Sequence, residues 1–313
     1  MTKKIAIIGL GGVGGYFGFK ITQKTRDTKD VKISFVAREK TFEAVRDHGL
    51  TLLSPENSGA AVRPDSLFSI IPEMEPQDLI LICVKAFDLE QVCEALKTKV
   101  EPDTVVLPLM NGVDIYDRVR NQLETGAVLP SCVYVASHIK EKGVIEHQGK
   151  PGRIILGKDP REHRQDTDWV VDFLADCGID VAFKADVFPD IWTKFYFIAS
   201  FGLISSRYDQ PMGAVCEEPA LRERAMAIMK EIGQIAANRG IALPQNITGL
   251  TFQKAAAFPY HTPTSLQLDI RSKKASNELD LFAGAIVRYG GELGIPVPET
   301  EKIYREIQEI MNN

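Results

Sequence analysis

Glycines near the start of the chain have the spacing of a nucleotide-binding loop. Gly9, Gly11 and Gly14 form a Gly-x-Gly-x-x-Gly pattern between a strand-like apolar run and a helix-like one. In this pattern the first glycine permits a tight turn, the second lets the backbone approach a pyrophosphate, and the third lets the helix pack closely on the strand. The helix N-terminus then offers unpaired N–H groups to the phosphates. The spacing predicts a dinucleotide site that also includes Gly12 and Val13.

Arg38 stands where such a site distinguishes between the two nicotinamide dinucleotides. NAD-specific sheets of this type carry an acidic residue about 20 residues beyond the glycines, which bonds the ribose 2′-hydroxyl. Here the second predicted strand, 31–38, ends in Val36-Ala37-Arg38. A guanidinium fork suits a phosphate dianion, so we expect Arg38 to bind the 2′-phosphate and the cofactor to be NADP (NADPH). The alternative is a solvated Arg38 at a helix start, with Glu39 binding the ribose.

Further candidates follow two continuous apolar runs, 79–84 and 104–109, which are typical of buried parallel strands. Lys85 and Asn111 stand at the carboxyl ends of these runs, where ligands bind in open α/β sheets. Each also has a simpler interpretation, Lys85 as a loop charge and Asn111, before Gly112, as a turn residue.

Lys194 is the candidate in the second half of the chain, within Ile191-Trp192-Thr193-Lys194-Phe195. Its aromatic and apolar neighbours favour a site residue over the alternative, an exposed lysine on a helix.

Composition indicates a globular protein of two domains. The 313 residues carry a formal net charge of −5, which excludes a global basic field for nucleic acid, and no apolar run is long enough to span a bilayer. The five scattered cysteines predict buried thiols in a reducing, cytoplasmic compartment, and the five histidines have no metal-binding spacing, so we expect no metal. The glycine density at the start argues against a secretory signal, so we expect the chain to be mature from its first residue.

The elements that must position the candidates differ between the two halves of the chain. Strands at 31–38, 79–84 and 104–109 alternate with helices at 39–48 and 88–96, which predicts an α/β fold with a doubly wound Rossmann-type sheet. Short strands over 127–156 suggest a mixed or antiparallel extension of that sheet, followed by a helix at 164–176 and a strand at 180–183. We expect this domain to span 1–188.

The second half is predicted to be an all-helical domain, 189–313, for substrate binding and dimerisation. Glycines and prolines separate its segments. The expected helices are 190–205, 219–238, 245–257, 276–293 and 299–311.

Over essentially its whole length the sequence resembles the ketopantoate reductase (2-dehydropantoate 2-reductase) family. The resemblance rests on the glycine motif, the Lys-Ala at a strand end, the Asn-Gly turn and Trp-x-Lys at the domain junction. Late in the chain it includes Ser265-Leu266-Gln267-Leu268-Asp269, Asn277-Glu278-Leu279-Asp280 and Gly294-Ile295-Pro296-Val297-Pro298.

The resemblance implies a role for each matching position. Lys194 would be catalytic, donating a proton or a charged hydrogen bond to a ketone oxygen as hydride arrives. Asn111 would orient substrate or nicotinamide, and Lys85 would lie near the cofactor. Glu278 would bind a substrate hydroxyl and line the cofactor site, and Ser265 would bind the substrate carboxylate. The simpler interpretations are a helix N-terminal acid for Glu278 and a helix cap for Ser265.

The sequence departs from the family on the helix that carries Lys194. The family has asparagines one and two turns after the lysine, and here those positions are Ile198 and Gly202. Either groups such as Ser205 or Tyr196 substitute, or the substrate differs. The segment before Glu278 is also one residue longer than usual.

The resemblance implies NADPH-dependent reduction of a 2-oxo acid, with 2-dehydropantoate and the route to coenzyme A as the first expectation. The alternatives are a paralogue that reduces a more apolar 2-oxo acid, motivated by Ile198 and Gly202, and a non-catalytic NADP-binding regulator. The expected partner is a small 2-oxo acid, without nucleic acid or membrane, and the protein could form a homodimer.

Overall fold

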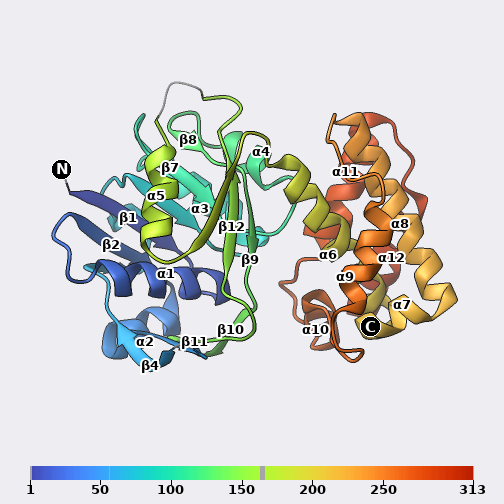
Figure 1. Ribbon diagram of the computed structural model, residues 1–313, viewed down its shortest axis with the longest axis horizontal. Helices are drawn as coiled ribbons and strands as arrows, with labels where there is room; N and C mark the ends of the chain where they lie inside the picture. Colours follow the sequence, from blue (N-terminus) through green and yellow to red (C-terminus); the bar gives the residue numbers. More distant parts are fainter. Residues whose placement is uncertain (1, 56, 163–165, 313) are drawn as a thin grey trace. The chain divides into compact units, whose positions relative to one another are not determined.

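The computed structural model describes residues 2–55, 57–162 and 166–312, and the chain divides into two compact units. Unit 1 is Met1–Asn111 with Ile115–Val187, and unit 2 is Gly112–Asp114 with Phe188–Asn313. In Figure 1 the colours from blue to yellow-green belong almost entirely to unit 1, and those from yellow to red belong to unit 2.

Unit 1 is built on a six-stranded sheet in the order β5-β2-β1-β6-β7-β8, with every neighbouring pair parallel. The strands are β1 (Lys3–Ile8), β2 (Val31–Val36), β5 (Ser66–Phe68), β6 (Leu79–Ile82), β7 (Val105–Pro108) and β8 (Ala127–Val128). The chain moves outward from β1 first in one direction and then in the other, which is the Rossmann order with its switch point between β1 and β6. The predicted fold class is confirmed.

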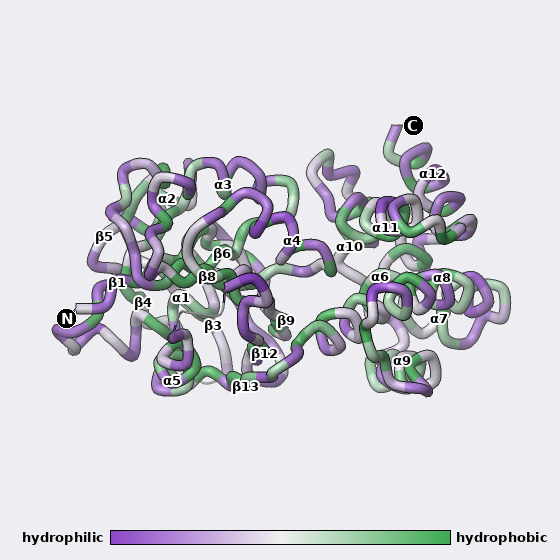
Figure 2. Tube along the Cα trace, turned by 90° about the horizontal axis from the view of Figure 1, so that it is seen from above, coloured by the Kyte–Doolittle hydropathy of each residue, from purple (hydrophilic) through white to green (hydrophobic). Residues whose placement is uncertain are grey.

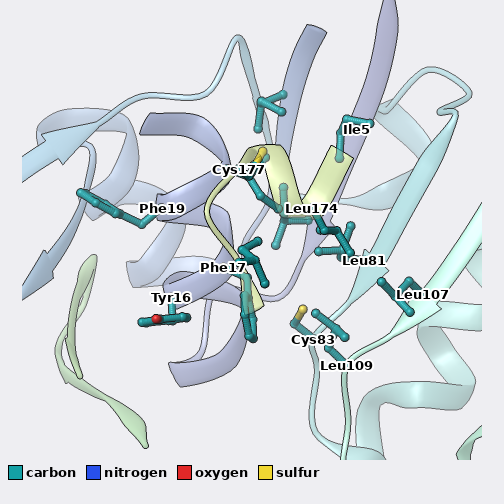
Figure 3. Close-up of a cluster of buried hydrophobic side chains, with 14 of the residues drawn as sticks. Ile5, Tyr16, Phe17, Phe19, Leu81, Cys83, Leu107, Leu109, Leu174 and Cys177 are labelled. Carbon is teal, nitrogen blue, oxygen red and sulfur yellow. The ribbon is translucent and has the colours of Figure 1, made fainter. Parts of the chain in front are cut away.

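Apolar side chains fix this sheet between helices. All residues of β6 and β7 are buried, as their continuous apolar sequence requires, and the trace through β6 is coloured hydrophobic in Figure 2. Helix α1 (Gly12–Thr25) and helix α5 (Asp168–Asp176) contribute to the same core, where Phe17 and Leu174 gather with Leu81 of the sheet (Figure 3). The predicted start of α5, at Arg164, lies outside the described residues.

The remaining helices of unit 1 are short and follow the strands. They are α2 (Glu39–His48), α3 (Leu89–Leu96), α4 (Ile115–Arg120) and the 3₁₀ turns η1 (Ile71–Glu73) and η2 (Ala86–Asp88).

The strands of 127–156 do not extend the main sheet as predicted, apart from β8. One further sheet has the order β10-β11-β3-β4, and another has the order β13-β12-β9. Their strands are β3 (Leu50–Ser54), β4 (Asn57–Val62), β9 (Ser131–Tyr134), β10 (Ser137–Glu141), β11 (Val144–His147), β12 (Arg153–Gly157) and β13 (Asp180–Lys184). The prediction was wrong because β11 finds its partner in β3, about 90 residues earlier, a pairing that local sequence patterns do not reveal.

Unit 2 is helical, as predicted. Its elements are α6 (Phe188–Tyr208), α7 (Met212–Glu217), α8 (Pro219–Asn238), α9 (Ile247–Ala256), α10 (Ser265–Arg271), a π-helix (Asp280–Gly284), α11 (Ala285–Leu293) and α12 (Pro298–Asn312). The short helix α7 was not predicted, and α10 was expected only in the alternative interpretation of Ser265 as a helix cap. The helix expected from 276 begins only around Leu279. No helix within the described residues combines the length and apolarity needed to cross a membrane.

A buried carboxylate fixes the end of one of these helices. Glu231 of α8 accepts hydrogen bonds from the backbone N–H groups of Glu299 (2.8 Å) and Thr300 (3.0 Å) and from the Thr300 hydroxyl (2.6 Å). Burial raises the pKa of Glu231, although these hydrogen bonds act in the opposite direction. The contact satisfies the first N–H groups of α12 from another helix, which ties α8 to α12.

Candidate functional site

The glycine loop between β1 and α1 has the backbone that its sequence predicts. Gly9 has a φ of +89°, and a Cβ atom there would lie 2.8 Å from Cγ1 of Val84. A Cβ atom on Gly14 would overlap the carbonyl oxygen of Gly9 and approach Cβ of Cys83 to 2.7 Å. The turn therefore requires glycine at Gly9, and the close approach of α1 to the sheet requires it at Gly14.

Gly11 is different, because a Cβ atom there would meet no heavy atom within 4 Å. Gly11 is also the N-cap of α1, where no side chain caps the helix and no acidic residue occupies the first turn. The helix N-terminus thus keeps its N–H groups and its positive end for an anion that approaches the backbone at Gly11. The loop fits the pyrophosphate of a dinucleotide.

Gly12, predicted as a cofactor residue, has a packing requirement of its own. A Cβ atom on Gly12 would overlap the carbonyl oxygen of Ser137 in β10, and one on Gly15 would overlap the Ile145 side chain in β11. Gly12 and Gly15 therefore let α1 pack against the sheet of order β10-β11-β3-β4. Val13 lies between them and is half-buried.

Strand β2 ends at Val36, two residues before Arg38, which stands at the start of α2 as the alternative interpretation expected and has an acidic partner. Its Nη2 lies 2.6 Å from Oδ2 of Asp88, a residue at the end of η2 beyond strand β6. The Arg38 side chain is 60% exposed and that of Asp88 is 19% exposed. Glu39, the alternative ribose ligand, is exposed and has a φ of +49°. Sequence reasoning assigned no role to Asp88, because it sought an acid only at the end of the second strand.

Lys85 and Asn111 lie at the carboxyl edge of the main sheet, after β6 and β7. Lys85 is exposed at the start of η2, and Asn111 is half-buried before Gly112, whose φ of +116° confirms the turn. The neighbouring Cys83 is buried, and burial raises the pKa of its thiol, so it stays neutral and unreactive. The nucleotide candidates of unit 1 therefore gather along one edge of one sheet.

Lys194 lies in unit 2, in the second turn of α6, and is half-buried. Helical periodicity places Ile198 one turn later and Gly202 two turns later on the same face. Ile198 is half-buried, and a Cβ atom on Gly202 would lie 3.6 Å from the Phe282 ring and 3.9 Å from Cβ of Leu266. Apolar groups thus stand at the two positions of α6 where the resemblance implies asparagines.

The two expected substitutes for those amides do not stand beside Lys194. The hydroxyl of Tyr196 lies 2.8 Å from Oγ1 of Thr248 in α9, on another side of the helix. Ser205 is fully buried, and within the described residues its hydroxyl has no hydrogen-bond partner. At about 1.5 Å rise per residue, however, it lies roughly 16 Å along the helix from Lys194.

Ser265 and Glu278 are the remaining candidates of unit 2. Ser265 is exposed at the first residue of α10, and the cap of that helix is Thr264, which forms a capping box with Gln267. The alternative interpretation of Ser265 as the cap is therefore wrong by one residue. Glu278 lies at the start of the helical segment that contains the π-helix, where its carbonyl oxygen accepts a hydrogen bond from the N–H of Phe282 (3.2 Å). This agrees with the simpler interpretation as a helix N-terminal acid, but the residue is only 5% exposed. Within the described ranges, no group of three or more His, Cys, Asp or Glu residues is placed to hold a metal ion.

Comparison with known families agrees with this arrangement. Residues 5–161 match the family described as "Ketopantoate reductase PanE/ApbA", and residues 186–311 match "Ketopantoate reductase PanE/ApbA C terminal". The chain belongs to the ketopantoate reductase PanE/ApbA family of oxidoreductases.

Individual relatives are distant, and their matches cover from about three quarters to nearly all of the chain. It is 25% identical over 305 residues to the uncharacterized oxidoreductase YkpB of Bacillus subtilis, covering 97% of this chain and 98% of YkpB. It is 23% identical over 235 residues to a 2-dehydropantoate 2-reductase of Streptococcus pyogenes, covering 73% and 76%.

Solved structures of the same fold include a PanE/ApbA family ketopantoate reductase from Ralstonia eutropha, with a TM-score of 0.87, 26% identity and coverage of 99% of this chain and 98% of that one. A D-mandelate dehydrogenase in complex with NADH and anilino(oxo)acetate shares the fold, with a TM-score of 0.84, 20% identity and coverage of 99% and 98%.

Proposed function

We propose that this protein uses NADPH to reduce a 2-oxo acid to a 2-hydroxy acid. The observation that carries the proposal is the open, uncapped N-terminus of α1 at Gly11, in a chain of the ketopantoate reductase family. Gly9, Gly11 and Gly14 would hold the pyrophosphate, with Arg38 at the adenosine ribose and Lys85 and Asn111 further along the same sheet edge. Bound NADPH would supply the hydride.

Lys194 would supply the proton. As the carbonyl carbon of the 2-oxo acid gains a hydride, its C=O π bond breaks and negative charge develops on the oxygen. A positioned ammonium stabilises that charge and then transfers a proton to give the hydroxyl group. We assign Ser265 to the substrate carboxylate and Glu278 to a polar group on substrate or cofactor. Family membership and the half-buried position of Lys194, with Ile198 one turn later and Gly202 two turns later, support this assignment.

The first candidate substrate is 2-dehydropantoate, the substrate in the name of the Streptococcus pyogenes relative. Its product, pantoate, would enter coenzyme A synthesis in the cytoplasm.

A second candidate is a 2-oxo acid with an apolar side chain. Ile198 and Gly202 favour it, because neither side chain offers a hydrogen-bonding group on the face that carries Lys194. A buried polar group of the substrate without a partner costs about 1–3 kcal/mol, so a hydroxylated substrate would lose affinity there.

A panel assay tests the proposal. Purified protein is mixed with NADPH and with 2-dehydropantoate, branched aliphatic 2-oxo acids and aromatic 2-oxo acids, and the loss of nicotinamide absorbance is followed. Efficient turnover of 2-dehydropantoate supports the first candidate, and preference for the apolar acids supports the second. NADPH binding without turnover of any 2-oxo acid would reject the reductase and support a regulator.

A further inference from the structure

The Arg38–Asp88 ion pair spans the glycine loop. The main sheet has β1 between β2 and β6, with Arg38 following β2 on one side and Asp88 lying beyond β6 on the other. Their 2.6 Å contact therefore crosses the carboxyl end of β1, from which the loop leaves. The switch point of the sheet, where sheets of this order bind a dinucleotide, lies beside this strand, between β1 and β6.

The side chains of Arg38 and Asp88 differ in their exposure to solvent. The Asp88 carboxylate is largely buried, and it does not cap its own helix α3. Arg38 is mostly exposed, and among the described residues its Nε and Nη1 donate to no other side chain or carbonyl. A fixed carboxylate thus holds one edge of a guanidinium whose remaining donors face solvent.

The Arg38–Asp88 pair carries groups that suit an adenosine ribose with either a 2′-phosphate or a 2′-hydroxyl. The guanidinium can bind a 2′-phosphate, while a carboxylate is the group that accepts a hydrogen bond from an unphosphorylated 2′-hydroxyl. Asp88 also offsets the positive charge of Arg38, which weakens the attraction for a phosphate dianion. An acid at this position therefore favours NADH relative to NADPH, even though it does not follow the second strand.

We propose that Asp88 sets the cofactor selectivity of this protein, so that the site accepts NADH as well as NADPH. Arg38 binds the 2′-phosphate of NADPH. Asp88 accepts a hydrogen bond from the 2′-hydroxyl of NADH, and its negative charge limits the preference for the phosphorylated cofactor. This inference rests on the proposed nucleotide site and adds to it a residue and a second cofactor.

Binding of nucleotide fragments tests the role of Asp88 apart from catalysis. The dissociation constants of adenosine 2′,5′-bisphosphate and 5′-AMP, which differ only in the 2′-phosphate, are measured by calorimetry on wild type and Asp88→Asn, and those of NADP⁺ and NAD⁺ alongside. Removing the negative charge of Asp88 should strengthen binding of adenosine 2′,5′-bisphosphate relative to 5′-AMP, and of NADP⁺ relative to NAD⁺, about tenfold. This is the size of effect expected for one charge near a protein surface. The preference of Arg38→Gln should move toward the unphosphorylated ligands.

Glu90→Gln is the matched control. Glu90 follows Asp88 by two residues, but its side chain is 75% exposed and faces Arg118 at 3.7 Å. This variant removes the same charge from the same segment and should leave the ratio of dissociation constants unchanged.

The outcomes separate this inference from the proposed function. If Asp88→Asn leaves the ratio of dissociation constants between phosphorylated and unphosphorylated ligands unchanged, or shifts it toward 5′-AMP and NAD⁺, the role of Asp88 is refuted. The proposed reductase function is not affected by that result. An equal shift in Glu90→Gln would also refute the role of Asp88, because the effect would then be one of general charge. If wild type binds none of the four ligands, the proposed nucleotide site itself fails.

Discussion

At the scale of residues, the proposed chemistry depends on one ammonium group, that of Lys194, with apolar residues following it on the same helix face. Lys194 shares its face of α6 with Ile198 and with Gly202, which adjoins Phe282. An ammonium in such surroundings interacts more strongly with a developing oxyanion than it would in water, because water screens it less. The proton donor and the specificity for the substrate side chain are therefore assigned to neighbouring turns of one helix.

Replacing the proton donor should separate catalysis from nucleotide binding. We expect Lys194→Ala to lower kcat about 10²–10⁴-fold, the range for loss of a general acid, and to change the Kd for NADPH less than twofold. Lys230→Ala, at an exposed lysine of α8, is the control and should leave both constants unchanged. Steady-state kinetics and NADPH titration measure the effects, and near-normal turnover in Lys194→Ala would remove this residue from the mechanism.

An amide at position 198 should change substrate preference. Ile198→Asn places a hydrogen-bonding group one turn after Lys194, so we expect kcat/KM for 2-dehydropantoate to rise about tenfold relative to an apolar 2-oxo acid. Thr193→Asn adds the same amide on a different side of α6 and should leave the ratio unchanged. An unchanged ratio in Ile198→Asn would show that this face of the helix does not contact the substrate.

At the scale of elements, two glycines of the loop between β1 and α1 serve different purposes: Gly14 allows α1 to pack on the sheet, and Gly11 leaves the helix N-terminus open for a ligand. The backbone at Gly14 leaves no room for a Cβ atom against Gly9 and Cys83, whereas the space at Gly11 is open. Closely packed backbone cannot move aside as a flexible side chain can, so the two positions should respond differently to the same added methyl group.

Alanine at these positions is a matched pair. We expect Gly14→Ala to lower the free energy of unfolding by about 2–3 kcal/mol, because α1 must move off the sheet. Gly11→Ala should fold with a loss below about 1 kcal/mol and bind NADPH at least about tenfold more weakly, because its methyl group occupies the approach to the helix N-terminus. Urea unfolding and NADPH titration distinguish them. Equal losses of stability would contradict the packing observed.

The contact between α8 and α12 should contribute measurably to stability. Glu231→Ala leaves two backbone N–H groups and the Thr300 hydroxyl without their acceptor, so we expect a loss of about 2–4 kcal/mol in the free energy of unfolding. Glu231→Gln keeps one oxygen acceptor and should lose about half as much. A loss below about 0.5 kcal/mol in Glu231→Ala, measured by urea denaturation, would show that water replaces the carboxylate.

The sequence predicted those helices and strands whose boundaries depend on neighbouring residues. The helices at Glu39–His48 and Pro219–Asn238 have the predicted bounds, and the buried strands of the main sheet were found within one or two residues from their apolar runs. The pairing of β11 with β3 was not predictable in this way, because it depends on segments far apart in the chain. The Arg38–Asp88 pair was missed for the same reason, since the strand order brings those segments together.

At the scale of the whole molecule, the proposed reaction draws on both units. The nucleotide candidates Gly11, Arg38 and Asn111 belong to unit 1, and the candidates for proton transfer and substrate binding, Lys194 and Ser265, belong to unit 2. Membership of an oxidoreductase family extends over both units, since each matches its own family region. The central claim is therefore that hydride passes from a reduced nicotinamide to a 2-oxo acid on this chain.

Transfer of isotope from cofactor to product tests that claim most directly. The protein is incubated with a 2-oxo acid and NADPH that carries deuterium at C4 of the nicotinamide, each C4 position in turn, and the product is analysed by mass spectrometry. We expect a 2-hydroxy acid with one deuterium on C2 from one of the two labelled cofactors, and at least about a hundredfold less from Lys194→Ala over the same time. Failure to form a labelled 2-hydroxy acid from any 2-oxo acid, by a protein that binds NADPH, would contradict the account.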